Sequence, residues 1–391
     1  MRMNDRLTEA VVLAAGEGRR LRPLTTFQPK PMLPVANRPV VEYVLDALFG
    51  SGIERAVVVV GHRADRIQSH LSATYPDADI EFVHQDTRLG SGHALLLAEE
   101  LVTGPFVVCN GDNVVDADIV LKALERFSTT DSVATIAVAE SDTPEEYGVV
   151  VEDNGRIADI DEHAVDSEGY LVNAGVYVFD DAVFEALRRT PPHDGETRLP
   201  DVIHYLDGHV TSVLVNGGWL DPSHPWGLLS VTETLLARRH DDAVAASARV
   251  HERALLGDHV VVGDDCDVGP GAVISGGSCL QNNVSVGANS VIERSILSTD
   301  ARVGAGVVLR DSVVGPGATV GDGVVSPGGR ADVILEGRLY TDRRLGSIIG
   351  DRAEVGANVT LTPGSRVGAE AVVGAGTVLH GDVRERVEVT H

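Results

Sequence analysis

Lysine is almost absent from this chain of 391 residues. Only Lys30 and Lys122 are lysines among 32 basic residues, 58 residues are acidic, and the formal net charge at pH 7 is −26. Contacts to nucleic-acid phosphates need clustered basic residues, so this charge argues against a nucleic-acid partner. Acidic, lysine-poor chains suit a high-salt, halophilic cytoplasm, where salt screens self-repulsion, although a codon bias would explain the same composition. Under either interpretation, a lysine at position 30 calls for a specific role.

Long apolar runs and cysteine motifs are also missing. Purely apolar runs such as Ala56–Val60 are no longer than a strand, so we expect no membrane span. The first ten residues, MRMNDRLTEA, contain no hydrophobic signal core, which predicts a cytoplasmic protein. The three cysteines (Cys109, Cys266 and Cys279) show no CxxC spacing, so the sequence predicts neither a disulfide framework nor a zinc site.

Residues 1–240 alternate short apolar runs with amphipathic stretches. This pattern is typical of an α/β domain, a sheet covered by helices on both faces. Arg38–Gly50 is a helix candidate, with Pro39 suited to its first turn and Gly50 to its end, and His93–Val102 is another. The predicted strands are Ala10–Ala15, Arg55–Val60, Ile80–His84, Pro105–Asn110, Ser132–Ala139, Gly169–Phe179 and Thr211–Asn216.

A different pattern begins at Val250, where apolar residues recur every six positions. Three hexads could complete one triangular coil of a β-solenoid whose inward residues stack into a continuous core. Residues 326–346 break the period and are expected to loop out. We therefore divide the chain into domains at residues 1–240 and 250–391, joined by a linker at 241–249. The periodic residues are Val250, Leu256, Val262, Val268, Ile274, Leu280, Val286, Ile292, Leu297, Val303, Leu309, Val314 and Val320, then Ile349, Val355, Leu361, Val367, Val373 and Leu379.

The stretch VVLAAGEGRRLRPLTTFQPKPMLPV, residues 11–35, joins a predicted strand to a glycine loop. It is not a GxGxxG dinucleotide fingerprint, because Leu21 stands where the third glycine belongs, and GxxxxGK[ST] is absent. A strand-to-helix turn carrying solvated arginines remains one interpretation. The other is a polyphosphate cradle of backbone N–H groups and the cations of Arg19, Arg20, Arg22 and Lys30.

Leu13–Val35 resembles the signature of the sugar-1-phosphate nucleotidyltransferases, LxxGxGTRLxPLT…KPxxPV. QDTRLGSGHAL (85–95) is similar to the base-binding segment of uridylyl-transferring members, and VCNGD, ending at Asp112, to their metal-aspartate strand. EEYGVV, NAGVYVF and GGWLDPSHPWGLL follow in the family's order. The hexads resemble those of left-handed parallel β-helices. The resemblance is closest to long archaeal members and to bifunctional uridylyltransferase/acetyltransferases. It implies a Rossmann-like mixed sheet followed by an all-β left-handed parallel β-helix.

The resemblance implies a Mg²⁺-dependent reaction between a nucleoside triphosphate, UTP or dTTP, and a sugar-1-phosphate. A phosphate oxygen of glucose-1-phosphate or N-acetylglucosamine-1-phosphate would attack the α-phosphorus and release pyrophosphate. No covalent intermediate is needed, so the protein would supply positioning and charge neutralisation. A catalytically dead regulatory subunit that binds nucleotide-sugar is an alternative, although the presence of both predicted cations and both predicted metal ligands argues against it.

The resemblance also implies roles for individual residues. Arg20 would contact the β- and γ-phosphates, and Lys30 would bridge the reacting phosphates. Asp112 and Asp221 would hold Mg²⁺, which prefers oxygen ligands, with turn roles as the alternative. Core or turn roles also stay open for the base and sugar residues. The further residues implied are Leu13, Ala14, Gly16, Gly18, Arg19, Gln85, Gly90 and Ser91 for the nucleotide, and Gly148, Glu162 and Asn173 for the sugar.

Two departures from the family pattern affect these expectations. Arg19 stands in place of the usual threonine of GxGTR and adds a charge. Glu162 is followed by His163 and Ala164 where many members carry Lys-Pro, so a lysine that could hold the sugar phosphate is missing.

The second domain lacks the acetyltransfer residues of bifunctional relatives. Ala305 and Val308 stand where their histidine and tyrosine belong, and after Val260 the only histidines are His380 and His391. Because an amine nucleophile needs a positioned base, acetylation of glucosamine-1-phosphate is only an alternative. We expect the β-helix to assemble the chain into a homo-oligomer, a trimer or a multiple of it.

Overall fold

The computed structural model describes residues 7–153, 156–161, 171–239 and 243–390. The chain forms two compact units, Met1–Glu17 with Val40–Leu220, and Gly18–Pro39 with Asp221–His391. These two packing units differ from the domains expected from the sequence, whose boundary is placed after residue 240. Residues 18–39 and the segment from Asp221 onward pack with the repeats instead. No helix in the described ranges combines the length and apolar character needed to span a bilayer.

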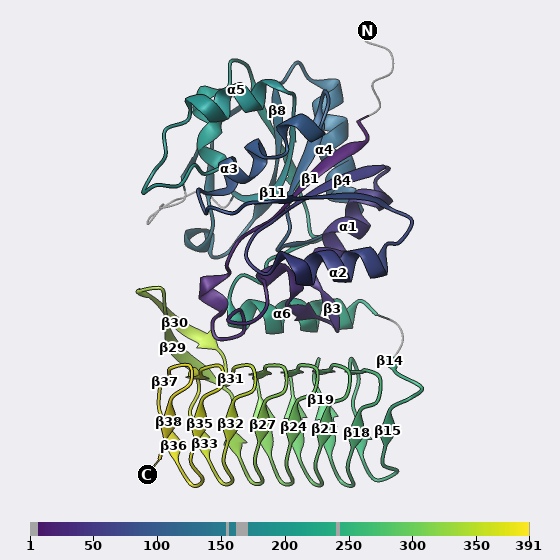
Figure 1. The fold of residues 1–391 in the computed structure, drawn as a ribbon, viewed down its shortest axis with the longest axis vertical. Helices are drawn as coiled ribbons and strands as arrows, with labels where there is room; N and C mark the ends of the chain where they lie inside the picture. The colour runs from purple at the N-terminus through teal and green to yellow at the C-terminus, as the bar shows by residue number, and fades with distance from the viewer. Residues whose placement is uncertain (1–6, 154–155, 162–170, 240–242, 391) are drawn as a thin grey trace. The chain divides into compact units, whose positions relative to one another are not determined.

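The first unit is built on a nine-stranded sheet in the order β10-β9-β11-β6-β1-β4-β5, with β8 on β11 and β12 on β8. Figure 1 labels β1, β4, β8 and β11 of this sheet. β1 pairs in parallel with both β4 and β6, whereas β11 is antiparallel to β6, so the predicted Rossmann-like mixed sheet is confirmed. The strands are β1 (Glu9–Ala14), β4 (Arg55–Val60), β5 (Asp79–His84), β6 (Phe106–Asn110), β8 (Ala134–Glu140), β9 (Val149–Asp153), β10 (Arg156–Asp161), β11 (Leu171–Phe179) and β12 (Val210–Val215).

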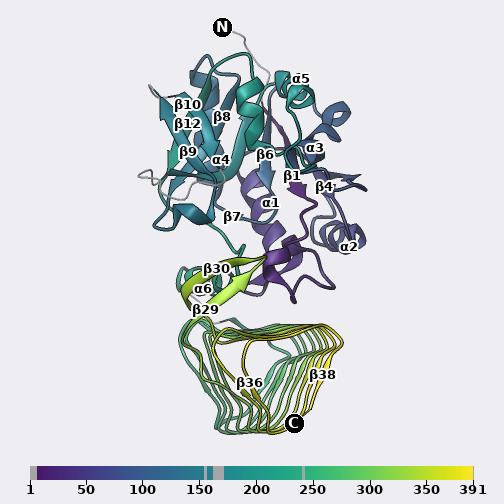
Figure 2. The ribbon, with the colours of Figure 1, turned by 90° about the vertical axis from the view of Figure 1, so that its left-hand side faces the viewer.

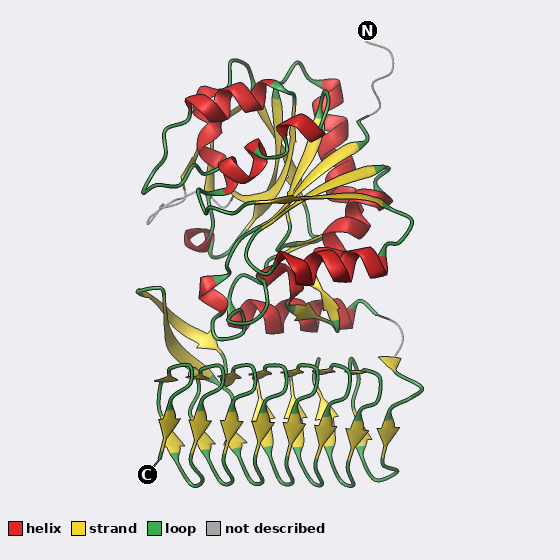
Figure 3. Cartoon of the chain, viewed as in Figure 1, coloured by secondary structure: helices red, strands yellow, loops and turns green. Residues whose placement is uncertain are grey.

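Both faces of this sheet are buried. Val11 and Phe106 pack with Leu95 and Leu187 in one apolar cluster, while Val12, which alternates with Val11 along β1, is fully buried on the opposite face. Figure 3 shows helices on both sides of the strands. The predicted helix at 93–102 is shorter than expected, because a 3₁₀ turn follows α3. The helices of this unit are α1 (Val40–Gly50), α2 (Ala64–Thr74), α3 (Ser91–Leu96), α4 (Ala117–Thr129) and α5 (Ala182–Arg189).

The repeats form three parallel sheets with the three-sided outline of Figure 2. Val250 pairs with Val268 and Leu256 with Ile274, three hexads along the chain, and the periodic apolar residues form one continuous core, as predicted.

The first sheet contains β14 (Ala243–Val244), β17 (Val261–Val262), β20 (Cys279–Leu280), β23 (Ile296–Leu297), β26 (Val313–Val314), β31 (Ser347–Ile349), β34 (Ser365–Val367) and β37 (Asp382–Val383). The second contains β15 (Arg249–Val250), β18 (Asp267–Val268), β21 (Ser285–Val286), β24 (Arg302–Val303), β27 (Thr319–Val320), β32 (Glu354–Val355), β35 (Val372–Val373) and β38 (Glu388–Val389). The third contains β16 (Leu255–Leu256), β19 (Val273–Ser275), β22 (Val291–Glu293), β25 (Val308–Arg310), β28 (Val325–Ser326), β33 (Thr360–Leu361) and β36 (Val378–Leu379).

The predicted interruption of the repeats is an ordered antiparallel hairpin rather than an irregular loop. It consists of β29 (Arg330–Leu335) and β30 (Arg338–Arg344). The second unit also contains helix α6 (Pro225–Ala237) and the short pair β2 (Pro34–Val35) and β3 (Arg38–Pro39). Another short pair, β7 (Val114–Val115) and β13 (Trp219–Leu220), belongs to the first unit.

Candidate functional site

The loop after β1 and the end of β6 lie side by side in the first unit. Leu13 pairs with Asn110, and its carbonyl accepts a 2.9 Å hydrogen bond from the amide of Gly111, the residue before Asp112. Leu13 and Ala14 are therefore next to the strand end that carries a predicted metal ligand. A Cβ added to Gly16 would meet no atom within 4 Å, so packing does not explain this glycine. The space fits an expected approach of phosphate to the backbone.

Two predicted motifs meet through an ion pair that the sequence did not indicate. Glu17 of the glycine loop pairs with Arg88 of QDTRLGSGHAL. Within that segment, Gln85 is only 7% exposed. Its amide nitrogen donates to the carbonyl of Gly90 at 3.0 Å and lies 3.0 Å from His93 Nδ1. Gln85 thus shapes the loop, and its predicted contact with a nucleobase stays a prediction.

The backbone conformation at residue 90 and the closeness of a neighbouring segment explain why this residue is a glycine. Its φ is 94°, and an added Cβ would lie 2.3 Å from the carbonyl oxygen of Thr197. Ser91, the first residue of α3, accepts a 2.9 Å hydrogen bond from the amide of Leu199. The backbone of Gly90 therefore lies close to the Thr197–Leu199 segment, which fixes the loop, and its predicted contact with a nucleobase stays a prediction.

Two of the three predicted sugar residues are joined. The amide of Asn173 donates to the carbonyl of Gly148 at 2.9 Å. The Asn173 side chain donates to the Tyr177 hydroxyl at 2.6 Å and accepts from the amide of Gly175 at 3.0 Å. Asn173 borders the irregular part of the β11–β8 register. The third residue, Glu162, lies outside the described residues.

The two predicted metal ligands flank one pair of strands in the sequence. Asp112 lies two residues before β7, and Asp221 follows β13 directly, while β7 and β13 pair Val114 with Leu220. Trp219 of β13 packs edge-on against Tyr147 at 5.3 Å between ring centroids. Its indole Nε1 is buried and has no hydrogen-bond partner among the described residues, so the packing against Tyr147 leaves this donor unexplained.

In the second unit, Lys30 is joined to Asp221 through a residue that the sequence did not single out. Lys30 is 8% exposed, and its ammonium donates a 2.6 Å hydrogen bond to the hydroxyl of Ser223. That hydroxyl in turn donates to Asp221 Oδ1. Gly18, with φ of 63°, leaves room for the lysine stem, because an added Cβ would lie 2.7 Å from Lys30 Cβ.

His224, which follows Ser223 in the sequence, is surrounded by positively charged side chains. Arg19 and Arg20 form a short 3₁₀ helix with Leu21 and are exposed, whereas His224 is 2% exposed. Burial, and then the charges of Arg20 and Lys30 followed by Arg343 and Arg338 of β30, lower the pKa of His224 to about 3. The imidazole is therefore neutral beside the predicted phosphate-binding cations. His224 and β30 were also missed, although the quoted GGWLDPSHPWGLL contains this histidine.

No group of three or more His, Cys, Asp or Glu side chains that could hold a metal occurs within the described ranges. Mg²⁺ is commonly bound through one or two carboxylates, with waters and substrate phosphates completing its coordination. Two aspartates of the predicted kind therefore fit a Mg²⁺ ion that binds together with a triphosphate.

Comparisons with known proteins agree with these features. Residues 9–237 match the nucleotidyl transferase family, and residues 240–330 match the GMPPB C-terminal domain. The bifunctional protein GlmU of Methanocaldococcus jannaschii is 29% identical over 409 residues, covering 97% of each chain. The UTP–glucose-1-phosphate uridylyltransferase AglF of Haloferax volcanii is 34% identical over 224 residues, covering 56% of this chain and 92% of its own.

A solved structure described as a glucose-1-phosphate thymidylyltransferase from Bacillus anthracis has a TM-score of 0.54 and 28% identity, covering 60% of this chain and 96% of that one. The family match spans more than half of the present chain, in the part that carries the glycine loop, Asp112 and Asp221. The resemblance inferred from the sequence motifs is thereby confirmed, and the chain belongs to the nucleotidyl transferase family.

Proposed function

We propose that this chain transfers a nucleotidyl group from UTP or dTTP to a sugar-1-phosphate, either glucose-1-phosphate or N-acetylglucosamine-1-phosphate. The family match and the named activities of its relatives support this reaction class. The observation that carries the proposal is the environment of Lys30. A chain with two lysines buries one of them, packs its stem beside Gly18 and holds its ammonium with Ser223.

The chemistry requires several negative charges to be held together. An oxygen of the sugar phosphate attacks the α-phosphorus of the triphosphate, the bond to the bridging oxygen breaks, and pyrophosphate leaves with both electrons of that bond. Lys30 offsets charge at the reacting phosphates, and Arg20 binds the β- and γ-phosphates. The family acts with a divalent metal, which we propose to be Mg²⁺ held by Asp112 and Asp221; when bound, it neutralises phosphate charge. Leu13, Ala14, Gly16, Gly18 and Arg19 present the loop to the triphosphate.

UTP is the favoured nucleotide. The LGSGHA segment resembles that of uridylyl-transferring members, and the name of AglF specifies UTP. Thymine differs from uracil by one methyl group, and a pocket distinguishes a group of that size by only ~10–200-fold. We therefore expect dTTP to be a slower substrate rather than an inert one.

Our proposal for the repeats is assembly of a homo-oligomer through the left-handed β-helix rather than acetyl transfer. Although the GlmU relatives are named bifunctional, Ala305 and Val308 replace the expected histidine and tyrosine in this chain. Tyr340, the only tyrosine after Val260, is buried against His224 and Trp226 instead. Incubation with acetyl-CoA and glucosamine-1-phosphate should therefore release no coenzyme A.

A substrate panel tests the proposal. Purified protein in high-potassium buffer with Mg²⁺ is given UTP, dTTP, GTP, ATP or CTP, each with several sugar-1-phosphates, and pyrophosphate release is measured. We expect turnover that is fastest with UTP and one acceptor, and lost on chelation of the metal. Folded protein that binds nucleotide but turns over no pair would contradict the enzyme assignment and favour a regulatory subunit.

A further inference from the structure

The residues that hold Lys30 stand at the start of helix α6. Ser223 and His224 directly precede Pro225, the first residue of this helix. The His224 ring stacks on Trp226 at 4.8 Å between centroids, with an angle of 9° between the planes. Both rings contact Tyr340 of β30, at 5.0 Å and 5.2 Å. A buried residue of the inserted hairpin therefore packs beside the Lys30–Ser223–Asp221 contacts.

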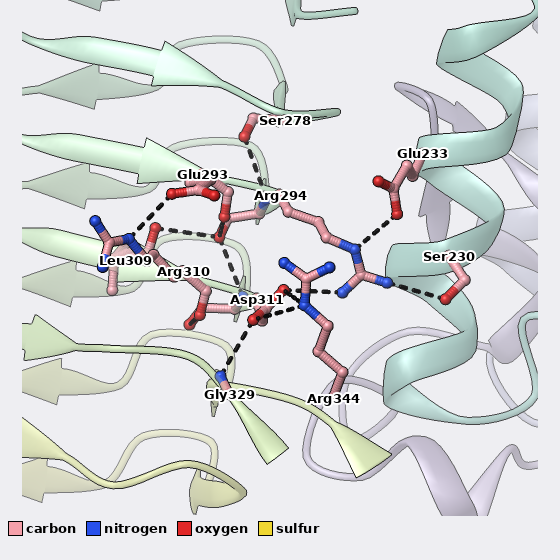
Figure 4. A network of polar contacts seen from close by, with 12 residues as sticks. Ser230, Glu233, Ser278, Glu293, Arg294, Leu309, Arg310, Asp311, Gly329 and Arg344 are labelled. Carbon is pink, nitrogen blue, oxygen red and sulfur yellow. Dashed lines mark hydrogen bonds and ion pairs between the residues drawn. The ribbon is translucent and has the colours of Figure 1, made fainter.

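The base of this hairpin is joined to α6 through an ion-pair network whose central pair, Arg294 and Asp311, is buried (Figure 4). Asp311 accepts hydrogen bonds from the amide of Gly329, just before β29, and from Arg344, the last residue of β30. It also pairs at 3.0 Å with Arg294. Arg294 donates to Glu233 at 2.7 Å and to Ser230 at 3.0 Å, both on α6. The hairpin and the helix thus share one rigid anchor.

The segment that carries Lys30 has its own contacts with the repeats. Arg352 lies over the ring of Phe27, 4.4 Å from its centroid. The Asn37 side chain donates a 2.7 Å hydrogen bond to the carbonyl of Leu280. Segment 18–39, α6 and the hairpin therefore belong with the repeats to one compact unit.

We propose that the β29–β30 hairpin is a positioning arm for nucleotidyl transfer, in which Tyr340 holds His224, the neighbour of Ser223, and thereby sets the position of the Lys30 ammonium. This rests on the proposed role of Lys30. Tyr340 is 4% exposed, and its ring contacts His224, Trp226 and Arg338, none of which is a predicted substrate-binding residue, so it is a positioning residue. The hairpin inserted in the repeats then serves the transfer reaction by positioning Lys30, in addition to the proposed assembly through the β-helix.

The chain offers a direct test because it has only two lysines. Full-length protein labelled with ¹³C,¹⁵N-lysine gives two lysine spin systems, assigned with Lys30→Ala and Lys122→Ala. We expect Tyr340→Ala to shift the Cε and Nζ signals of Lys30 and to leave those of Lys122 unchanged. Leu339→Ala is the matched control, because Leu339 is the neighbouring residue of β30 and is 55% exposed. It should move neither lysine.

Kinetics supply the functional half of the test. Tyr340→Ala should lower kcat by roughly 10- to 100-fold with little change in KM, since small misplacement of a catalytic group is costly. Tyr340→Phe should restore kcat, and Tyr340→Ala should cost nothing further in a Lys30→Ala background. If Tyr340→Ala fails to fold, Tyr340→Leu keeps the apolar volume while removing the ring contacts.

The outcomes separate the two proposals. Unchanged Lys30 signals in a folded Tyr340 variant, or an equal loss of kcat with and without Lys30, would overturn the positioning arm. If the wild-type protein shows no turnover with any substrate pair, the proposed function fails, while the lysine spectrum still decides whether Tyr340 sets the position of Lys30.

Discussion

The ammonium of Lys30 and the hydroxyl of Ser223 lie 2.6 Å apart, joining residues 193 positions apart in the chain. Because Ser223 also donates to Asp221, a predicted phosphate-binding cation and a predicted metal ligand share one hydroxyl group. This arrangement holds the lysine stem and ammonium before substrate binds, which lowers the cost of ordering them at the transition state.

Lys30→Ala should lower kcat for pyrophosphate release by ~10²–10³-fold, the usual cost of one contact to a developing charge. Lys122→Ala is the matched control, because Lys122 is 42% exposed and pairs at 2.6 Å with Asp118 on the surface of α4. Steady-state kinetics on both variants check the prediction. Equal activities in the two variants would remove Lys30 from the mechanism.

Ser223→Ala should separate Lys30 from Asp221 while leaving both charges in place. A hydrogen bond to a charged group contributes about 1.5–3 kcal/mol, so we expect kcat to fall by roughly 10- to 100-fold. Ser223→Thr keeps the hydroxyl and should retain more activity than the alanine variant. The measurement is kcat at saturating substrates, with melting temperature as the check on folding; an alanine variant as active as wild type would argue against the shared hydroxyl.

Gly90→Ala should distort the predicted base-binding loop, because the new Cβ would clash with the Thr197 carbonyl. We expect KM for the nucleotide to rise about 10-fold or more as the loop moves. Gly52→Ala is the control for backbone strain alone, since Gly52 has the same φ of 94° but no atom within 4 Å of an added Cβ. If both variants change KM equally, the clash is not the cause.

The buried His224 predicts a dependence of stability on pH. Its folded pKa of about 3 lies below the ordinary value of 6.5, so the unfolded state binds more protons between these values. This contribution is complete above pH 6.5, and the free energy of unfolding should fall by about 1.4 kcal/mol per pH unit as pH decreases toward 3. Urea unfolding at several pH values should show a shallower slope for His224→Phe than for wild type. His380→Gln, at an exposed histidine of the repeats, is the matched control.

Asp311→Asn should destabilise the repeats, because it removes the carboxylate that pairs with the buried Arg294. Breaking a buried ion pair by removing one partner typically costs about 3–5 kcal/mol. Asp342→Asn in the exposed pair with Arg330 should cost ~0–1 kcal/mol. Denaturant midpoints of the two variants are compared. Similar midpoints would show that the Asp311 carboxylate does not contribute this stabilisation to the folded protein.

The repeats could be predicted closely because their signal is local and periodic. Each inward residue, such as Val268 or Ile274, repeats a position three hexads away, and sheet register follows from that spacing. The glycine loop and Asp112 were also predictable, since both follow apolar runs that form adjacent parallel strands.

The surroundings of Lys30 could not be predicted in the same way. The Asn37–Leu280 hydrogen bond joins positions 243 apart, and no periodicity in either segment indicates it. Ser223 lies within the recognised segment GGWLDPSHPWGLL, but nothing in that segment singles it out, and Tyr340 belongs to no recognised motif. The Glu17–Arg88 ion pair joins two recognised motifs, yet only the fold shows that they meet.

The proposed nucleotidyl transfer is most directly tested by running the reaction in reverse, from nucleotide-sugar and pyrophosphate. The protein is incubated with UDP-glucose, Mg²⁺ and ³²P-labelled pyrophosphate, and labelled nucleotide is measured beside a Lys30→Ala control. Attack of pyrophosphate on the α-phosphorus of the nucleotide carrying the sugar should give labelled UTP and glucose-1-phosphate, with the rate greatly reduced in the control. Absence of labelled triphosphate with UDP-glucose, UDP-N-acetylglucosamine and dTDP-glucose, in folded wild-type protein, would contradict the account.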